Sequence, residues 1–195
     1  MDILEILLLS AINLGLAVFA GAYLGHTGLL DLENSKLGFR KRIIVGIIIF
    51  GSLAFIGEYS CSAVGYTFRD GGVISGGLFF GPFIGIGAAL MVLAYRVTLG
   101  GITLIPCIIG TLLAGTISGT VYYRYKEKIT VVTATLVALI IELIHVGMVI
   151  VFLPDGQGAD IIFSEIGLLV VIMSTIFVLV FTASYFTMKV NRNSN

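Results

Sequence analysis

Six apolar blocks divide the chain, and each is about as long as a membrane-crossing helix. An α-helix needs roughly 20 apolar residues to cross a hydrocarbon core about 30 Å thick. Hydrophobic residues make up 58% of the 195 and charged residues 11%, whereas soluble domains carry about 25% charged residues. No segment alternates with a period of two for long enough to predict barrel strands. The sequence therefore predicts one membrane-embedded domain over residues 1–195, an all-α integral membrane bundle with apolar blocks at about 3–24, 43–59, 72–95, 102–123, 129–153 and 161–188.

The third block, 72–95, carries helix-breaking residues in its middle: Gly76, Gly77, Gly81, Pro82, Gly85 and Gly87. Proline removes a backbone donor and clashes with the preceding turn. Broken backbone at membrane depth is tolerated only where protein buries it or a cavity hydrates it. We therefore expect a re-entrant or broken helix pair meeting near Gly81-Pro82, with a single kinked spanning helix as the alternative. The spacing of Gly77, Gly81 and Gly85, and of Gly115 and Gly119, is typical of close helix packing in lipid.

The positive-inside rule favours the re-entrant arrangement. Basic residues gather near 36–42, near 124–128 and in the tail, whereas the loop PDGQGAD at 154–160 has none. If the third block enters and returns on one side, all eleven Lys and Arg except Arg69 and Arg96 become cytoplasmic. We therefore predict five transmembrane helices plus the broken pair, with the N-terminus outside and the C-terminus in the cytoplasm. Met1–Ala22 opens with acidic residues, which indicates a first transmembrane helix and not a signal peptide.

Arg69 and Arg96 flank the third block. In the re-entrant arrangement both face outward, so their guanidinium groups can converge. Arginine binds a carboxylate through a planar fork, and an intramembrane charge by default marks a functional site. The sequence thus predicts an anion clamp. The alternative is structural, with Arg69 paired to Asp70 or both side chains reaching the lipid head groups. Glu58, near the outer end of the second block, either caps the two arginines or competes with a ligand for them.

Further polar residues accompany the predicted clamp. Cys107 lies about one turn into the fourth block, where its thiol can line the same cavity with Thr103 and Thr111 as neighbouring hydroxyls. Taken alone, a membrane cysteine more often serves as a small apolar packing residue. Glu142 and His145 are three apart on one face of the fifth block. They form either a structural hydrogen-bonded pair or a proton-responsive element.

Composition and motifs exclude several classes of function. Cys61 and Cys107 are the only cysteines and lack metal-ligand spacing, so neither a disulfide scaffold nor a zinc site is expected. The net charge is zero and no basic run suggests nucleic acid. The sequence has no HExxH, Walker loop, GxSxG or catalytic aspartate pair. We therefore expect no enzyme activity, no cofactor and no metal.

The stretch Phe68–Tyr123 carries a framework of short motifs: an arginine, then GGLFFGPFIGIGA, YR, LGG, PC and LAG. This framework closely resembles the five-transmembrane receptor domain of LytS-type bacterial sensor kinases. The resemblance is dense over residues 69–115 and extends over the whole chain through the five-crossing pattern. It implies a sensory input domain of a two-component or related signalling protein.

The resemblance also implies a ligand. The pyruvate-sensing members bind a small monocarboxylate outside, and their binding residues carry over to Arg69, Arg96 and Cys107. Gly110 stands where a hydroxyl is expected one turn after the cysteine, with Thr111 adjacent, and Tyr95 replaces a frequent histidine. The expected ligand-binding set is Arg69, Arg96, Cys107, Thr103, Thr111 and Gly110, with Glu142 and His145 as an intramembrane polar pair.

Family members usually continue into GAF, histidine-kinase or diguanylate-cyclase domains, whereas this sequence ends at Asn195. We expect either an excised receptor domain or a free-standing protein that acts through a separate kinase. In both cases we expect a homodimer in the cell membrane, in contact with lipid. The predicted function is a membrane sensor for a small extracellular carboxylate such as pyruvate. A transporter or substrate-capture subunit is the main alternative, since transporters also use broken helices and mid-membrane polar residues. A structural membrane protein without a ligand is the third.

Overall fold

The computed structural model describes residues 3–31, 37–61, 67–153 and 165–194, together with positions 156, 158 and 160. These residues form helices and turns, with no strand among them. The helices are α1 (Ile3–Thr27), α2 (Phe39–Cys61), α3 (Arg69–Phe80), α4 (Pro82–Leu99), α5 (Leu104–Tyr125), the 3-10 turn η2 (Lys126–Lys128), α6 (Val131–Phe152) and α8 (Glu165–Ser194).

Six of the described helices are long and apolar enough to cross a membrane, namely α1, α2, α4, α5, α6 and α8. The predicted all-α membrane bundle is confirmed. With 12 residues, α3 extends only about 18 Å at 1.5 Å per residue, which is less than the thickness of a hydrocarbon core. The start of the predicted last block and most of the PDGQGAD loop lie outside the described residues.

The third apolar block is broken at the predicted position. Gly81 separates α3 from α4 and has φ of +100°, a conformation that glycine adopts without steric cost. A Cβ on Gly85 would lie 2.8 Å from the Cα of Gly77, whereas eight residues of one continuous helix span about 12 Å. The chain therefore folds back into an α3–α4 hairpin, and a single kinked helix is wrong. The prediction differs in one respect, because α4 has 18 residues and is itself of spanning length.

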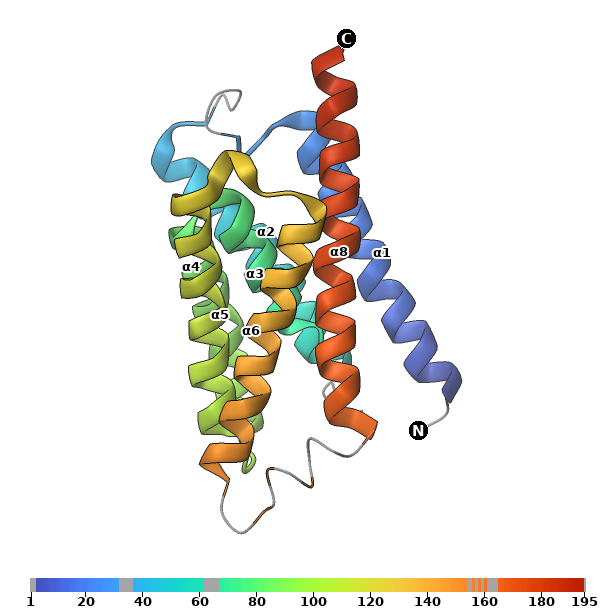
Figure 1. Ribbon diagram of the computed structural model, residues 1–195, viewed down its shortest axis with the longest axis vertical. Coiled ribbons are helices and arrows are strands. Elements are labelled where there is room, and N and C mark those ends of the chain that lie inside the picture. Colours follow the sequence, from blue (N-terminus) through green and yellow to red (C-terminus); the bar gives the residue numbers. More distant parts are fainter. Residues whose placement is uncertain are drawn as a thin grey trace.

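The short helix α3 lies at the centre of the bundle. It contacts α2, α4, α5, α6 and α8, and all its residues from Arg69 to Leu78 are buried. Helix α1 packs mainly along α8 at one edge (Figure 1). Because α3 is enclosed by its neighbours, the polar residues at its start are withdrawn from lipid.

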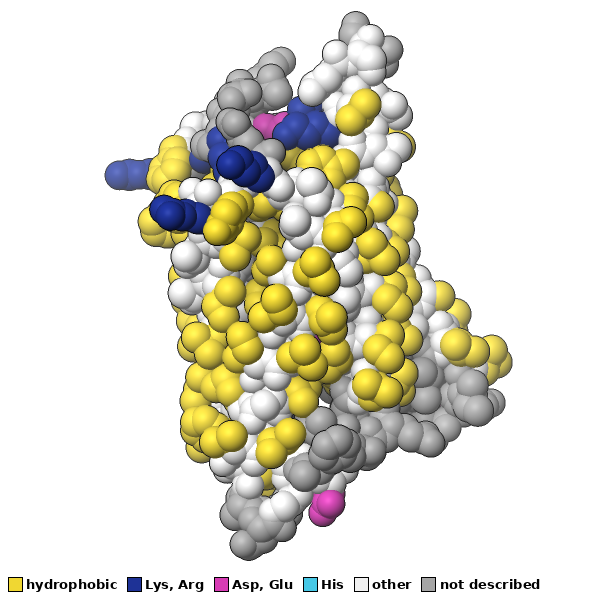
Figure 2. Space-filling view, in the orientation of Figure 1, with side chains coloured by type: hydrophobic (Ala, Val, Ile, Leu, Met, Phe, Trp, Pro, Cys, Tyr) yellow, Lys and Arg dark blue, Asp and Glu magenta, His cyan; other side chains and the backbone are white. Residues whose placement is uncertain are grey.

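The positive charge outside the bundle interior gathers at one end of the molecule. Figure 2 shows Lys and Arg side chains at the end where α8 finishes, whereas α1 begins at the other end. We call the former the basic end. Its described cations lie at the start of α2, at the end of α5 and in η2, and at the end of α8: Arg40, Lys41, Arg42, Arg124, Lys126, Lys128, Lys189 and Arg192. Lys36 lies outside the described residues. Arg69 and Arg96 are separated from this group and face the bundle interior.

Candidate functional site

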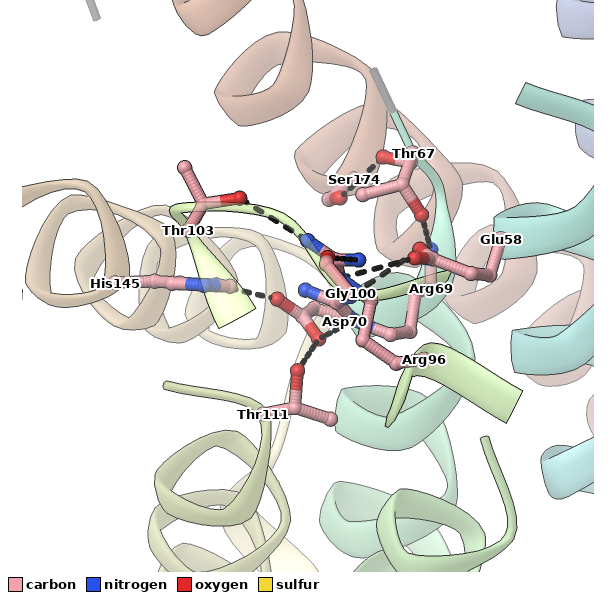
Figure 3. A network of polar contacts seen from close by, with 10 residues as sticks. All are labelled: Glu58, Thr67, Arg69, Asp70, Arg96, Gly100, Thr103, Thr111, His145 and Ser174. Carbon is pink, nitrogen blue, oxygen red and sulfur yellow. Dashed lines mark hydrogen bonds and ion pairs between the residues drawn. The ribbon is translucent and has the colours of Figure 1, made fainter. Parts of the chain in front are cut away.

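Both ends of the α3–α4 hairpin meet at a carboxylate from α2. Glu58 Oε2 lies 3.2 Å from Arg69 Nη1, and its Oε1 lies 3.5 Å from Arg96 Nε. The side chains of Arg69, Arg96 and Glu58 are 1%, 11% and 6% exposed. The two arginines thus converge as predicted, and a carboxylate of the protein itself bridges them (Figure 3).

Asp70 is the hub of the cluster, because it connects three helices. Its Oδ1 lies 3.1 Å from Arg69 Nε and accepts a hydrogen bond of 2.8 Å from the Thr111 hydroxyl on α5. Its Oδ2 lies 2.6 Å from Nδ1 of His145 on α6. The sequence indicated Asp70 only as a partner of Arg69. An aspartate at the edge of an apolar block was the signal that could have indicated a larger role.

Arg96 also organises the turn that leads from α4 into α5. Its Nη1 donates to the carbonyl of Gly100 at 2.7 Å, and its Nη2 donates to the hydroxyl of Thr103 at 3.0 Å. Gly100 has φ of +66°, a left-handed conformation that favours glycine. The guanidinium group therefore connects Glu58 to the start of α5.

Cys107 lies one turn after Thr103 on α5 and donates its backbone N–H to the Thr103 carbonyl at 3.0 Å. Its thiol is free and half-buried. Cys107 lies three residues before Gly110, the position against which the His145 ring packs. It therefore borders the same cluster.

Gly110 has a steric role beside His145. A Cβ at Gly110 would collide with the imidazole ring, with the ring atoms Cδ2, Cγ and Nε2 as its nearest neighbours. Glycine at this position therefore lets His145 approach α5 closely enough to reach Asp70. The hydroxyl expected one turn after Cys107 would not fit here without displacing the imidazole. Thr111, the adjacent residue, directs its hydroxyl to Asp70 instead.

Glu142 and His145 lie close together, but His145 Nδ1 forms its hydrogen bond with Asp70. Glu142 is fully buried, and neither of its carboxyl oxygens has a hydrogen-bond partner among the described residues. One ligand atom from each of Asp70, Glu142 and His145 lies within 4.8 Å of the other two. These three residues have donor types that bind divalent metals, yet both oxygens of Asp70 are already occupied by Arg69, Thr111 and His145.

The structure thus brings all the predicted site residues into one neighbourhood formed by α2, α3, α4, α5 and α6. Arg69, Arg96, Thr103, Thr111 and His145 are joined to it by hydrogen bonds or ion pairs, and Cys107, Gly110 and Glu142 border it. Tyr95 packs instead on Phe55, with ring centroids 4.9 Å apart. An incoming anion would meet two buried guanidinium groups that already contact the carboxylates of Glu58 and Asp70.

Comparison with known proteins assigns the chain to a family. Residues 29–185 match the family model described as 5TMR of 5TMR-LYT. The chain is 36% identical over 99 residues to the sensor histidine kinase YpdA of Escherichia coli, covering 49% of this chain and 17% of that protein. It is 31% identical over 118 residues to the sensor protein LytS of Bacillus cereus and 32% identical over 116 residues to LytS of Bacillus anthracis. These two matches cover 59% and 58% of this chain and 20% of each relative.

The chain spans about a fifth of the length of these relatives. No solved structure gives a significant match. The family match extends over most of the chain and concerns a membrane receptor region, not a kinase catalytic domain. The chain therefore belongs to the 5TMR-LYT family of membrane sensor regions, as the sequence framework predicted.

Proposed function

We propose that this member of the 5TMR-LYT family senses a small carboxylate such as pyruvate, which binds between Arg69 and Arg96. One observation supports the proposal above all others. A single carboxylate, that of Glu58, lies between the two guanidinium groups at 3.2 and 3.5 Å. A ligand carboxylate that took this position would find both charged donors already oriented, since charge-assisted bonds from arginine strongly favour carboxylates.

The surrounding groups suit the remaining part of such a ligand. The Thr103 hydroxyl accepts a hydrogen bond from Arg96, and Cys107 follows Thr103 by one turn on α5. Both can contact the carbonyl end of a 2-oxo acid from this position. Thr111 and His145 hold Asp70 and so fix Arg69. Gly110 lets His145 take this position. Each residue of the predicted set thereby has a role in contacting the ligand or in supporting a residue that does.

The ligand would enter from the outer face of the membrane. The positive-inside rule assigns the basic end to the cytoplasm, so the N-terminus lies outside and the C-terminus inside. The arginines lie away from the basic end, toward the face where α1 begins. A carboxylate that reaches these arginines would therefore come from the outer face, opposite the cytoplasmic basic end.

Helix α8 is the natural output element. Gly71, next to Asp70, lies so close to α8 that an added Cβ would approach Phe177 within 2.8 Å. At the basic end, Asp31 accepts hydrogen bonds from Tyr185 and Arg192 of α8 at 2.8 and 2.7 Å. A shift of α3 on binding would pass to α8 by direct contact and change its cytoplasmic end, where a kinase of the same or a partner protein would respond. We expect the chain to act as a homodimer.

Titration calorimetry of the purified protein tests the binding step. Pyruvate and a panel of other small carboxylates should include at least one that binds saturably, and Arg96→Gln should weaken that binding about tenfold or more. Arg124→Gln is the matched control, because it removes an exposed arginine at the basic end and should leave the affinity unchanged. Absence of binding by any carboxylate to folded protein would reject the proposal. Uptake of the ligand into proteoliposomes would instead indicate a transporter.

A further inference from the structure

An apolar groove lies at the basic end, where α5 ends and α6 begins (Figure 1). Its volume is about 320 Å³, and ligand sites in proteins span roughly 300 to 1,000 Å³. Residues from α3, α5, η2 and α6 line it, among them Leu78, Val121, Tyr125, Lys128, Ala134 and Val137. Because Leu78 belongs to α3, the groove reaches the central helix that begins with the buried polar cluster.

Aromatic and apolar side chains around the groove indicate its depth in the membrane. Tyr123 and Tyr125 at the end of α5 are more than half exposed, and tyrosine is enriched where a bilayer meets water. On α6, Val132 and Leu136 are also more than half exposed, as expected of a surface in contact with lipid. Tyr125 itself lines the groove, whereas Val137 lines it almost two turns into α6. The groove therefore opens at the level of the lipid head groups and extends toward the bilayer interior.

One positive charge stands at the mouth of this apolar groove. Among the described residues that line it, Lys128 alone is charged, and its side chain is exposed. None of the ion pairs between described side chains involves Lys128. Arg124 and Lys126 precede it in the chain, with Glu127 as the one acidic residue among them, so the segment has a net positive charge. The groove thus combines apolar walls with a cationic rim.

We propose that this groove binds an anionic phospholipid of the cytoplasmic leaflet, with an acyl chain along α5 and α6 and the phosphate at Lys128. The positive-inside rule assigns the basic end to the cytoplasm. The cytoplasmic leaflet carries anionic lipids, and basic pockets between transmembrane helices on that side bind anionic head groups. A free phosphate would leave the apolar walls uncovered, and a zwitterionic lipid would bring a second cation close to Lys128. The inference does not depend on the proposed function, since no carboxylate ligand takes part.

Native mass spectrometry of the purified protein tests the lipid site. Phosphatidylglycerol and phosphatidylcholine with identical acyl chains are the probes. We expect one molecule of phosphatidylglycerol to bind about fivefold more tightly than phosphatidylcholine, because one lysine near an anionic lipid surface contributes about this factor. Lys128→Gln should abolish the preference. Lys126→Gln is the matched control and should keep it, because Lys126 is exposed in the same turn but does not line the groove.

A second pair of variants tests the position of the acyl chain. Val137→Phe places a larger side chain in the groove and should weaken the binding of phosphatidylglycerol about fivefold or more. Leu136→Phe is the matched control, because Leu136 is exposed on the same helix and does not line the groove. It should leave the affinity unchanged.

Three outcomes would overturn the proposal. Equal affinity of the parent protein for the two lipids would reject a site for an anionic lipid, and this measurement does not depend on any variant folding. An equal loss of preference in Lys126→Gln and Lys128→Gln would show general attraction to the basic end and no defined site. Unchanged lipid binding in Val137→Phe, together with a weakened dimer, would assign the groove to a second copy of the chain.

Discussion

The two ends of the α3–α4 hairpin are held together by different forces. At the closed tip, backbones touch: a Cβ on Gly85 would lie 2.8 Å from Gly77 Cα, and a Cβ on Gly115 would lie 2.8 Å from Gly85 backbone atoms. At the open end, Arg69 and Arg96 are joined through Glu58. No ligand group can replace a contact between two packed backbones. In an ion pair, by contrast, a ligand carboxylate can replace the carboxylate of the protein. The tip is therefore suited to be a pivot, and the open end is suited to respond to a ligand.

The largest effect should come from removing a charge at the open end. Arg69→Met removes one positive charge from beside the buried carboxylates of Glu58 and Asp70. Breaking a buried ion pair in this way costs about 3 to 5 kcal/mol. We expect a corresponding loss in the free energy of unfolding, measured by denaturant titration in detergent. Adding Glu58→Gln to Arg69→Met should recover part of the loss. A double variant as unstable as the single one would show that charge imbalance is not the cause.

Overfilling the tip should have the next largest effect. Gly115→Leu would push α5 away from α4, and inserting side-chain atoms into a packed interior costs about 1 to 3 kcal/mol. Gly147→Leu on α6 is the control, because nothing lies within 4 Å of a Cβ at that position. Thermal unfolding should separate the two variants clearly. Equal melting temperatures would mean that the tip tolerates separation and is not a fixed pivot.

A smaller effect is expected where a neutral hydrogen bond supports the open end. Thr111→Val removes the hydroxyl that donates to Asp70 at 2.8 Å, and such a bond contributes about 1 kcal/mol. Thr116→Val on the same helix is the control, since its exposed hydroxyl bonds the Leu112 carbonyl within α5. The difference in unfolding free energy between the two variants measures the Asp70 contact. A difference near zero would remove Thr111 from the supporting network.

The smallest effect should appear at the rim. Thr103→Val removes the acceptor of the 3.0 Å bond from Arg96 Nη2, but Glu58 and the Gly100 carbonyl still hold this guanidinium group. We expect near-unchanged stability and a few-fold weaker carboxylate affinity by calorimetry, because one partly exposed hydrogen bond contributes about 0.5 to 1.5 kcal/mol. The Thr98 hydroxyl is exposed and bonds the Tyr95 carbonyl within α4. The control variant Thr98→Val should therefore change neither the stability nor the carboxylate affinity. Equal affinity in both variants would exclude Thr103 from the ligand site.

Local sequence determined the membrane class, the helices and the break at Gly81-Pro82. Apolar length is a property of consecutive residues, and a glycine-proline pair interrupts a helix whatever surrounds it. The basic residues of the sequence gather at one end of the bundle. Successive crossings alternate in direction, so segments separated by two crossings return to the same side of the membrane. The convergence of Arg69 and Arg96 followed from that same alternation, since a chain that folds back brings its two ends together.

Tertiary structure alone decided which polar groups became partners. Asp70 bonds Thr111 and His145, which are 41 and 75 residues away. The sequence allows Glu58 two roles, and only the folded structure gives its distances to both arginines. The same holds for His145, which bonds Asp70 although Glu142 is its neighbour on α6. A hydrogen bond requires its atoms to lie within a few tenths of an ångström of their optimal separation. That separation depends on how each helix is rotated and how high it sits against the others, and the packing of the whole bundle fixes both.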